Sequence, residues 1–141
     1  MAQDLPTQAR VVIIGGGIAG CSVAYHLIKL GWTDVVLLER KSLTSGTTWH
    51  AAGLVREVLG AYTMTRLAQY SMQLFKGLEA ETGQATGWHG CGSVRLALRD
   101  EEVDWFHAVK GVLDYLDIES FLIGPSEIQE IHPLLVVDDV K

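Results

Sequence analysis

The 141-residue chain is 48% hydrophobic and 20% charged, proportions that suit one globular domain. It has no apolar run of about 18 residues, which a membrane-spanning helix needs, and no basic patch with interleaved aromatic residues, so we expect neither a membrane span nor a nucleic-acid partner. Its two cysteines, Cys21 and Cys91, form no CxxC pair and no disulfide framework. We therefore expect a reducing, cytoplasmic setting and assign no metal site.

The first structured stretch is a strand, a glycine-rich turn, a helix and a second strand within residues 11–40. Residues 11–14 (VVII) are apolar and β-branched, which is typical of a buried strand. Three glycines then follow at G-x-G-x-x-G spacing: Gly15, Gly17 and Gly20. The next residues predict a helix that stops at Gly31, and residues 35–38 (VVLL) predict the second strand.

This glycine spacing, in this context, is the fingerprint of a dinucleotide-binding turn. Gly15 allows the tight turn, Gly17 lets a pyrophosphate approach the backbone, and Gly20 lets the helix pack closely on the sheet. The pyrophosphate then faces the helix N-terminus, whose free N–H groups and positive dipole end favour an anion. Glu39 ends the second strand, where its carboxylate accepts hydrogen bonds from an adenosine ribose and repels a 2′-phosphate. FAD or NAD is therefore favoured over NADP, although Arg40 weakens the repulsion slightly.

Residues 41–59 predict a loop, because their first half suits neither a strand nor a helix. Small and hydroxylated residues cluster directly after the nucleotide-binding unit, in the run T-S-G-T-T at residues 44–48, and Trp49 and His50 follow. Hydroxyl and amide groups in such a run are suited to hydrogen-bonding a phosphate or a flavin ring. Gly46 allows close approach of the backbone.

The remaining residues predict further helices and two short strands. Residues 61–82 have the apolar periodicity of an amphipathic helix. Apolar residues alternate over residues 93–98, which predicts a half-buried strand, and residues 118–123 predict a short second one. Asp100 is placed to cap a helix between them. Residues 126–129 (SEIQ) have capping-box spacing at the start of a last short helix.

Two segments read together resemble a known family. The segment SGTTWHAAGL, which follows VVLLERKSLT, is similar to the N-terminal part of the dimethylglycine dehydrogenase and sarcosine dehydrogenase family. These enzymes belong to the D-amino-acid-oxidase-like flavoproteins. The later segments GWHGCGSVRLAL and PSEIQEIHPLL are also similar, so the resemblance covers essentially the whole chain.

The expected fold is α/β, with a Rossmann-like βαβ unit that binds FAD and the beginning of a second, α+β substrate domain. We assign residues 1–60 to the start of the FAD-binding domain and residues 61–141 to a helical segment with the first elements of the substrate domain. A nucleotide-binding sheet of this type needs several more strands, and residues 134–141 contain no helix or strand stop. We therefore expect the chain to be the N-terminal fragment of a longer enzyme, inactive by itself.

The resemblance implies FAD as the cofactor, bound covalently through His50 to the 8α-carbon of the flavin. It implies that the glycine turn approaches the FAD pyrophosphate, that Glu39 binds the adenosine ribose with Arg40 beside it, and that the hydroxylated loop leads to the flavin ring. The cofactor-binding residues that it implies are Gly15, Gly17, Ile18, Ala19, Gly20, Glu39, Arg40, Gly46, Thr47, Thr48, Trp49 and His50.

The implied reaction is oxidation of an N-methyl glycine-type amine, dimethylglycine or sarcosine, by hydride transfer to the flavin. The electrons then pass to a protein or to oxygen, and tetrahydrofolate accepts the one-carbon unit if a further C-terminal domain binds it. No catalytic residue is assignable, because the substrate-binding groups are expected beyond Lys141. Three alternatives stay open: another amine or amino-acid oxidase of the group, a relative that regulates a phosphatase, and a non-catalytic fragment.

Overall fold

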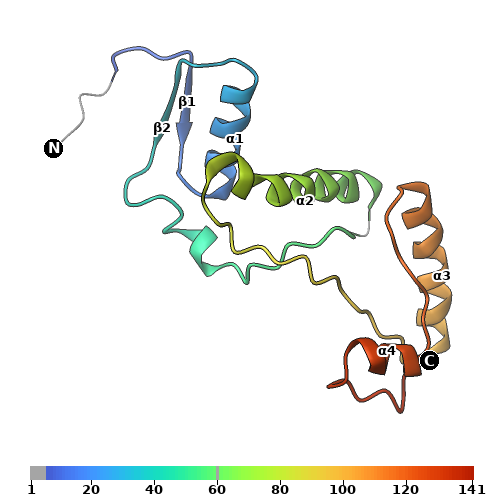
Figure 1. Cartoon of the computed structure of the whole chain (residues 1–141). Coiled ribbons are helices and arrows are strands. Elements are labelled where there is room, and N and C mark those ends of the chain that lie inside the picture. Colours follow the sequence, from blue (N-terminus) through green and yellow to red (C-terminus); the bar gives the residue numbers. More distant parts are fainter. Residues whose placement is uncertain (1–5, 60) are drawn as a thin grey trace. The chain divides into compact units, whose positions relative to one another are not determined.

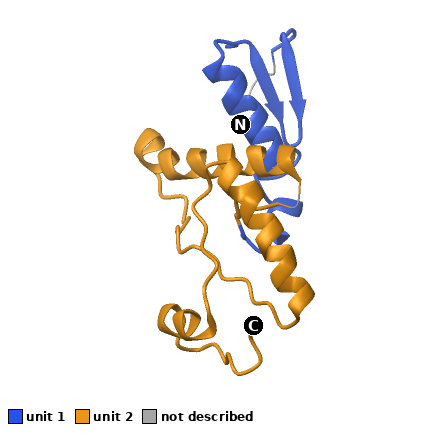
Figure 2. Cartoon of the chain, turned by 90° about the vertical axis from the view of Figure 1, so that its right-hand side faces the viewer, with its two compact units in different colours: residues 1–54 blue, residues 55–141 orange. Residues whose placement is uncertain are grey.

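The computed structural model describes residues 6–59 and 61–141. The chain divides into two compact units, Met1–Leu54 and Val55–Lys141 (Figure 2). Our expected domain boundary lies after residue 60, which is outside the described residues, and it stays a prediction. None of the described helices combines the length and the apolar character needed to cross a bilayer.

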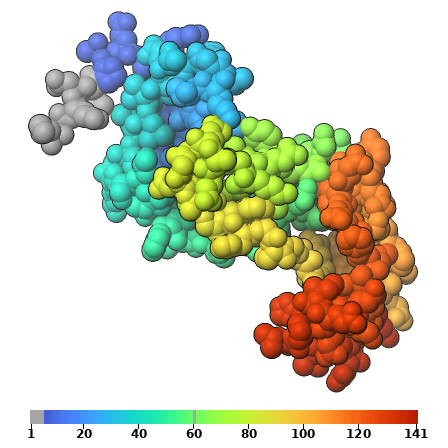
Figure 3. All heavy atoms as spheres, in the orientation of Figure 1, coloured from blue at the N-terminus to red at the C-terminus, as the bar shows by residue number. Residues whose placement is uncertain are grey.

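The first unit contains the expected βαβ arrangement. Strand β1 (Val11–Ile14) leads into helix α1 (Ile18–Lys29), and strand β2 (Val35–Leu38) returns beside β1 (Figure 1). The strands are parallel, with Val11 opposite Val35 and Ile14 opposite Leu38. In the space-filling view, α1 (light blue) lies against β2 (cyan) (Figure 3). Parallel pairing brings the carboxyl ends of both strands to one edge, where α1 begins.

Local contacts fix the two ends of this arrangement. At its far end, the backbone N–H of Arg10 donates to the Asp34 carboxylate at 3.0 Å, and the Arg10 guanidinium lies 4.1 Å from the centre of the Trp32 ring. Helix α1 stops at Gly31, whose φ of +84° suits glycine and ends the helical path. These contacts hold the starts of β1 and β2 together.

The described part of the second unit contains three helices, α2 (Tyr62–Thr82), α3 (Asp100–Tyr115) and α4 (Pro125–Ile131) (Figure 1). Its buried cluster consists of Leu113, Leu116 and Ile118, at and just beyond the end of α3, against which Val58 and Val109 pack. Helix α2 ends at Gly83 in the left-handed conformation, as expected for a glycine stop.

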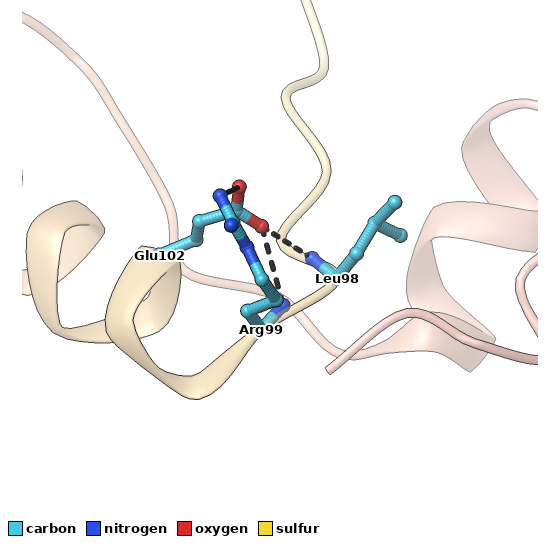
Figure 4. Close-up of polar contacts among 3 residues, drawn as sticks. All are labelled: Leu98, Arg99 and Glu102. Atoms are coloured by element: carbon cyan, nitrogen blue, oxygen red, sulfur yellow. Dashed lines mark hydrogen bonds and ion pairs between the residues drawn. The ribbon is translucent and has the colours of Figure 1, made fainter.

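The beginning of α3 is capped differently from our prediction. Asp100 is the first helical residue, and the residue that caps the helix is Arg99. The Glu102 carboxylate accepts hydrogen bonds from the backbone N–H groups of Leu98 at 2.8 Å and Arg99 at 3.2 Å, and pairs with the Arg99 guanidinium at 2.6 Å (Figure 4). A carboxylate one turn into the helix reaches back to the donors that precede it, which Asp100 cannot do.

Helix α4 also begins earlier than the predicted capping box. Its first residue is Pro125, and the Glu127 carboxylate accepts the backbone N–H of Gly124 at 2.9 Å. The prediction that Ser126 caps the helix through residue 129 was therefore wrong. Proline is favoured at the first helical position because it has no N–H to leave unpaired.

The two strands predicted in the second unit are not formed. Residues 93–98 and 118–123 contain no strand, and among the described residues the sheet consists of β1 and β2. The Ala97 carbonyl accepts the backbone N–H of Lys141 at 2.9 Å, but no ladder follows. Alternating apolar residues make a strand only where a neighbouring strand pairs with them.

Candidate cofactor site

The glycine turn between β1 and α1 requires glycine at Gly15 for its backbone conformation and at Gly20 for its close packing. Gly15 has a φ of +106°, and its N–H donates to the Leu38 carbonyl at 2.8 Å, which joins the turn to the end of β2. A Cβ atom on Gly20 would lie 1.9 Å from the Gly15 carbonyl oxygen. Helix α1 therefore begins in direct contact with the end of β1, which is the close packing that the glycine spacing predicts.

The first turn of α1 presents backbone donors that suit an anion. The backbone N–H of Ile18 donates to the Thr48 hydroxyl at 2.9 Å. The N–H groups of Ala19 and Gly20 follow in the same turn and have no acceptor among the described residues. The turn also contains no acidic side chain. Free donors and the positive end of the helix dipole fit the pyrophosphate of a dinucleotide.

Glu39 lies where the end of β2 meets the glycine turn. One carboxylate oxygen accepts the backbone N–H of Gly16 at 2.8 Å, and the other accepts that of Lys41 at 2.9 Å. These two bonds, with a smaller contribution from the Arg40 charge, hold the pKa of the Glu39 carboxyl below its usual 4.5. A carboxylate has about four lone-pair positions, so acceptor capacity remains for a ribose hydroxyl.

Gly16 is a residue that the sequence analysis missed. Its N–H bonds Glu39, and its carbonyl accepts the backbone N–H of Thr44 at 2.8 Å. A Cβ atom at Gly16 would lie 2.5 Å from a Leu43 methyl group and 3.0 Å from the Glu39 Cβ. The fingerprint leaves this position free, and the only signal was the run of three consecutive glycines. Thr44 is equally unexpected, because it adopts a φ of +62° that non-glycine residues rarely take.

His50 ends a single turn of 3-10 helix, η1 (Thr47–His50). Its Nδ1 lies 2.9 Å from the Gly46 carbonyl oxygen. Because a carbonyl only accepts, this contact assigns the proton of a neutral ring to Nδ1 and leaves the lone pair on Nε2. The backbone N–H of Trp49 closes the same turn onto the carbonyls of Thr44 and Gly46, both at 3.1 Å. The imidazole is thus oriented and exposed.

The structure therefore brings part of the predicted set together. The glycine turn, the first residues of α1, Glu39 and Thr48 form one connected group. The side chains of Arg40, Thr47 and Trp49 are exposed and lie outside the hydrogen bonds of that group. The roles of all twelve residues in binding a cofactor stay predictions.

Comparison with known proteins decides the family. The family model described as DAO, FAD dependent oxidoreductase, matches residues 10–141. The chain belongs to this family. The resemblance and the α/β flavoprotein fold class predicted from the sequence are both confirmed.

Similar proteins include a dehydrogenase and a regulatory subunit. The chain is 44% identical over 133 residues to mitochondrial dimethylglycine dehydrogenase of Rattus norvegicus, a match covering 94% of this chain and 16% of that protein. It is 43% identical over 136 residues to the mitochondrial pyruvate dehydrogenase phosphatase regulatory subunit of Mus musculus, covering 96% and 16% respectively. The chain thus spans about a sixth of the length of these relatives.

A solved structure supports the same fold. L-proline dehydrogenase from P. horikoshii superimposes with a TM-score of 0.81 at 30% sequence identity. The match covers 96% of this chain and 36% of that chain. The chain therefore has the fold of part of an FAD-dependent oxidoreductase of this group.

Proposed function

We propose that the full-length protein, defined as the longest natural chain that contains these residues, oxidises the N-methyl group of dimethylglycine or sarcosine with FAD. The proposal rests on membership of the FAD-dependent oxidoreductases, on the 44% identity to a dimethylglycine dehydrogenase, and on the TWHAAGL segment around His50. When bound, FAD supplies the two-electron acceptor for oxidation of a carbon beside an amine nitrogen. The 141-residue chain by itself is proposed to be inactive.

The residues of this chain hold the cofactor in the proposal. The free N–H groups of Ala19 and Gly20 bind the pyrophosphate, and Gly15 and Gly17 leave the space for it. Glu39 binds the adenosine ribose through the lone pairs that its two backbone contacts leave open. The free donors in the first turn of α1 are the observation that carries this part, because the first N–H groups of a helix have no intrahelical partner and can donate to a phosphate.

His50 is proposed as the covalent attachment point of the flavin. Its Nδ1–H is directed to the Gly46 carbonyl, so the ring has a fixed orientation and Nε2 keeps a lone pair that would bond the 8α-carbon. In that step the 8α-carbon would lose a proton, and the flavin would take up the two electrons. The exposure of the side chain leaves Nε2 accessible.

Acid precipitation of the full-length protein tests both the cofactor and its attachment. The parent protein should give a washed pellet with flavin fluorescence, and His50→Ala should release its flavin into the supernatant. His89→Ala is the matched control, because His89 is also an exposed loop histidine but lies in the other unit. Flavin in the supernatant of the parent would reject the covalent bond, and flavin in neither fraction would reject the proposed function.

A regulatory role is the second candidate. The observation that favours it is the 43% identity to a phosphatase regulatory subunit, close to the identity with the dehydrogenase. Turnover assays with dimethylglycine and sarcosine separate the two. Reduction of the bound flavin by either amine supports the enzyme, and a flavoprotein that neither amine reduces supports the regulatory role or an oxidase for another amine.

Three further parts of the proposal concern partners and place. The electron acceptor is a protein or oxygen, and tetrahydrofolate is proposed as acceptor of the one-carbon unit in a domain outside these residues. Stopped-flow reoxidation in air tests oxygen as the electron acceptor, and formaldehyde release with and without tetrahydrofolate tests the transfer of the one-carbon unit. The cytoplasmic location expected from the cysteines stays a prediction.

A further inference from the structure

We propose that Thr48 is a positioning residue that caps helix α1 and fixes the loop that carries His50 onto the pyrophosphate end of the site. This inference rests on the proposed function for its effect on FAD. The cap itself involves residues of this chain alone. Its hydroxyl accepts the backbone N–H of Ile18 at 2.9 Å from a position 30 residues further along the chain.

Helix α1 has no cap of its own. The residue at its cap position is Gly17, which has no side chain, and its first turn contains no acidic residue. Most helices satisfy one of their first N–H groups with a nearby Ser, Thr, Asp or Asn. Here the donor of Ile18 is satisfied by Thr48 instead, so the stability of the first turn depends on where the loop lies.

The close approach of Thr48 also depends on the glycine turn. A Cβ atom at Gly17 would lie 3.0 Å from the Thr48 hydroxyl oxygen, a distance that forces one of the two groups to move. The absence of a side chain at Gly17 therefore leaves room for the Thr48 hydroxyl as well as for a phosphate.

A hydrogen-bonded turn links the position of Thr48 to that of His50. Both residues belong to η1, and the backbone N–H of Trp49 between them bonds the carbonyls of Thr44 and Gly46. Gly46 also accepts the Nδ1 contact of His50. A displacement of Thr48 therefore moves the turn that orients the imidazole.

The division of donors follows from this arrangement. Thr48 occupies the N–H of Ile18, and the N–H groups of Ala19 and Gly20 stay free for the pyrophosphate. Thr48 acts on FAD through the helix and the loop, which is the role of a positioning residue. Ordering the loop before the cofactor arrives reduces the entropy that binding must remove.

The test compares Thr48→Val, which keeps the shape and removes the hydroxyl, with Thr48→Ser, which keeps the hydroxyl. Thr33→Val is the matched control, because Thr33 is exposed in the same unit beyond the other end of α1. Two quantities are measured in the full-length protein carrying His50→Ala, from which the cofactor can be removed: amide hydrogen exchange at Ile18 and residues 46–50 without ligand, and the FAD dissociation constant.

We expect Thr48→Val to exchange about fivefold faster at Ile18 and to weaken FAD binding by a similar factor, the size of a typical lost cap. Thr48→Ser and Thr33→Val should stay close to the parent. Unchanged exchange in Thr48→Val with normal FAD binding would overturn the proposed role of Thr48 and leave the proposed function standing. If the parent binds no FAD, the proposed function and the effect of Thr48 on FAD are both rejected.

Discussion

Replacement of Gly20 by alanine tests whether the close contact between α1 and β1 is required. The added Cβ would lie 1.9 Å from the Gly15 carbonyl oxygen and 3.3 Å from a methyl group of Ile13. To lengthen the distance between the new Cβ atom and the Gly15 oxygen to 3.0 Å, α1 must move away from β1 by about 1 Å. The clash has no easier solution, because the Gly15 oxygen is a backbone atom and cannot change rotamer. Overpacking of this kind costs about 1–3 kcal/mol, against up to about 1 kcal/mol gained from alanine in a helix.

The net expectation for Gly20→Ala is a loss of about 1 kcal/mol in the free energy of unfolding. The matched substitution Gly77→Ala changes an exposed glycine in α2 where nothing lies within 4 Å of the added Cβ. It should stabilise the protein by about 0.5–1 kcal/mol, because glycine in a helix interior is unfavourable. The same chemical change thus has opposite signs at the two positions.

Urea unfolding of the full-length protein, followed by circular dichroism, measures both changes. Retained flavin is measured in parallel, because retreat of α1 also displaces the donors of Ala19 and Gly20. Equal stability of Gly20→Ala and the parent, with flavin retained, would refute the reasoning. Destabilisation by both substitutions would refute it as well, because the clash would then not be the cause.

Two further predictions concern carboxylates that accept backbone N–H groups. The lowered pKa of Glu39 means that its bonds stabilise the fold above pH 4.5 and that this contribution is lost as the pH falls through the lowered pKa. Glu39→Gln should therefore flatten the dependence of the unfolding free energy on pH below pH 4.5, and an unchanged slope in urea titrations would contradict this. Glu102→Ala should lose hydrogen-exchange protection at the start of α3, whereas Glu102→Gln keeps an acceptor and most of the protection. Equal protection in both Glu102 variants would show that the cap is not made by this side chain.

The sequence predicted the first unit well because its signals are local. The runs VVII and VVLL predicted β1 and β2 at the bounds that the structure has, and Gly31 ends α1 as expected. An apolar run, a glycine turn and a helix stop each act within a few residues of one another. Such features need no knowledge of distant contacts.

The failures in the second unit have the opposite cause. Residues 93–98 alternate as a strand does, but a strand exists only with a partner, and the chain here supplies one backbone contact between Lys141 and Ala97. Periodicity describes which face of a segment is apolar and says nothing of its neighbour. The predictions of the helix caps failed for a related reason. The side chains of Glu102 and Glu127 accept the N–H groups that precede each helix, in place of the predicted caps Asp100 and Ser126.

In the cofactor site, the residues that the fingerprint names were predictable and the contacts that join them were not. Glu39 was expected from its distance to the glycines, yet its hydrogen bond to Gly16 required the loop geometry. Gly16 has both backbone groups engaged, one by Glu39 and the other by Thr44, while Thr48 reaches the next turn of the chain at Ile18. The loop and the glycine turn are therefore held to each other by hydrogen bonds within the chain. A change in either should appear at both ends of the site, and for this reason we expect Gly17 and Thr48 to behave as one unit in double-mutant cycles.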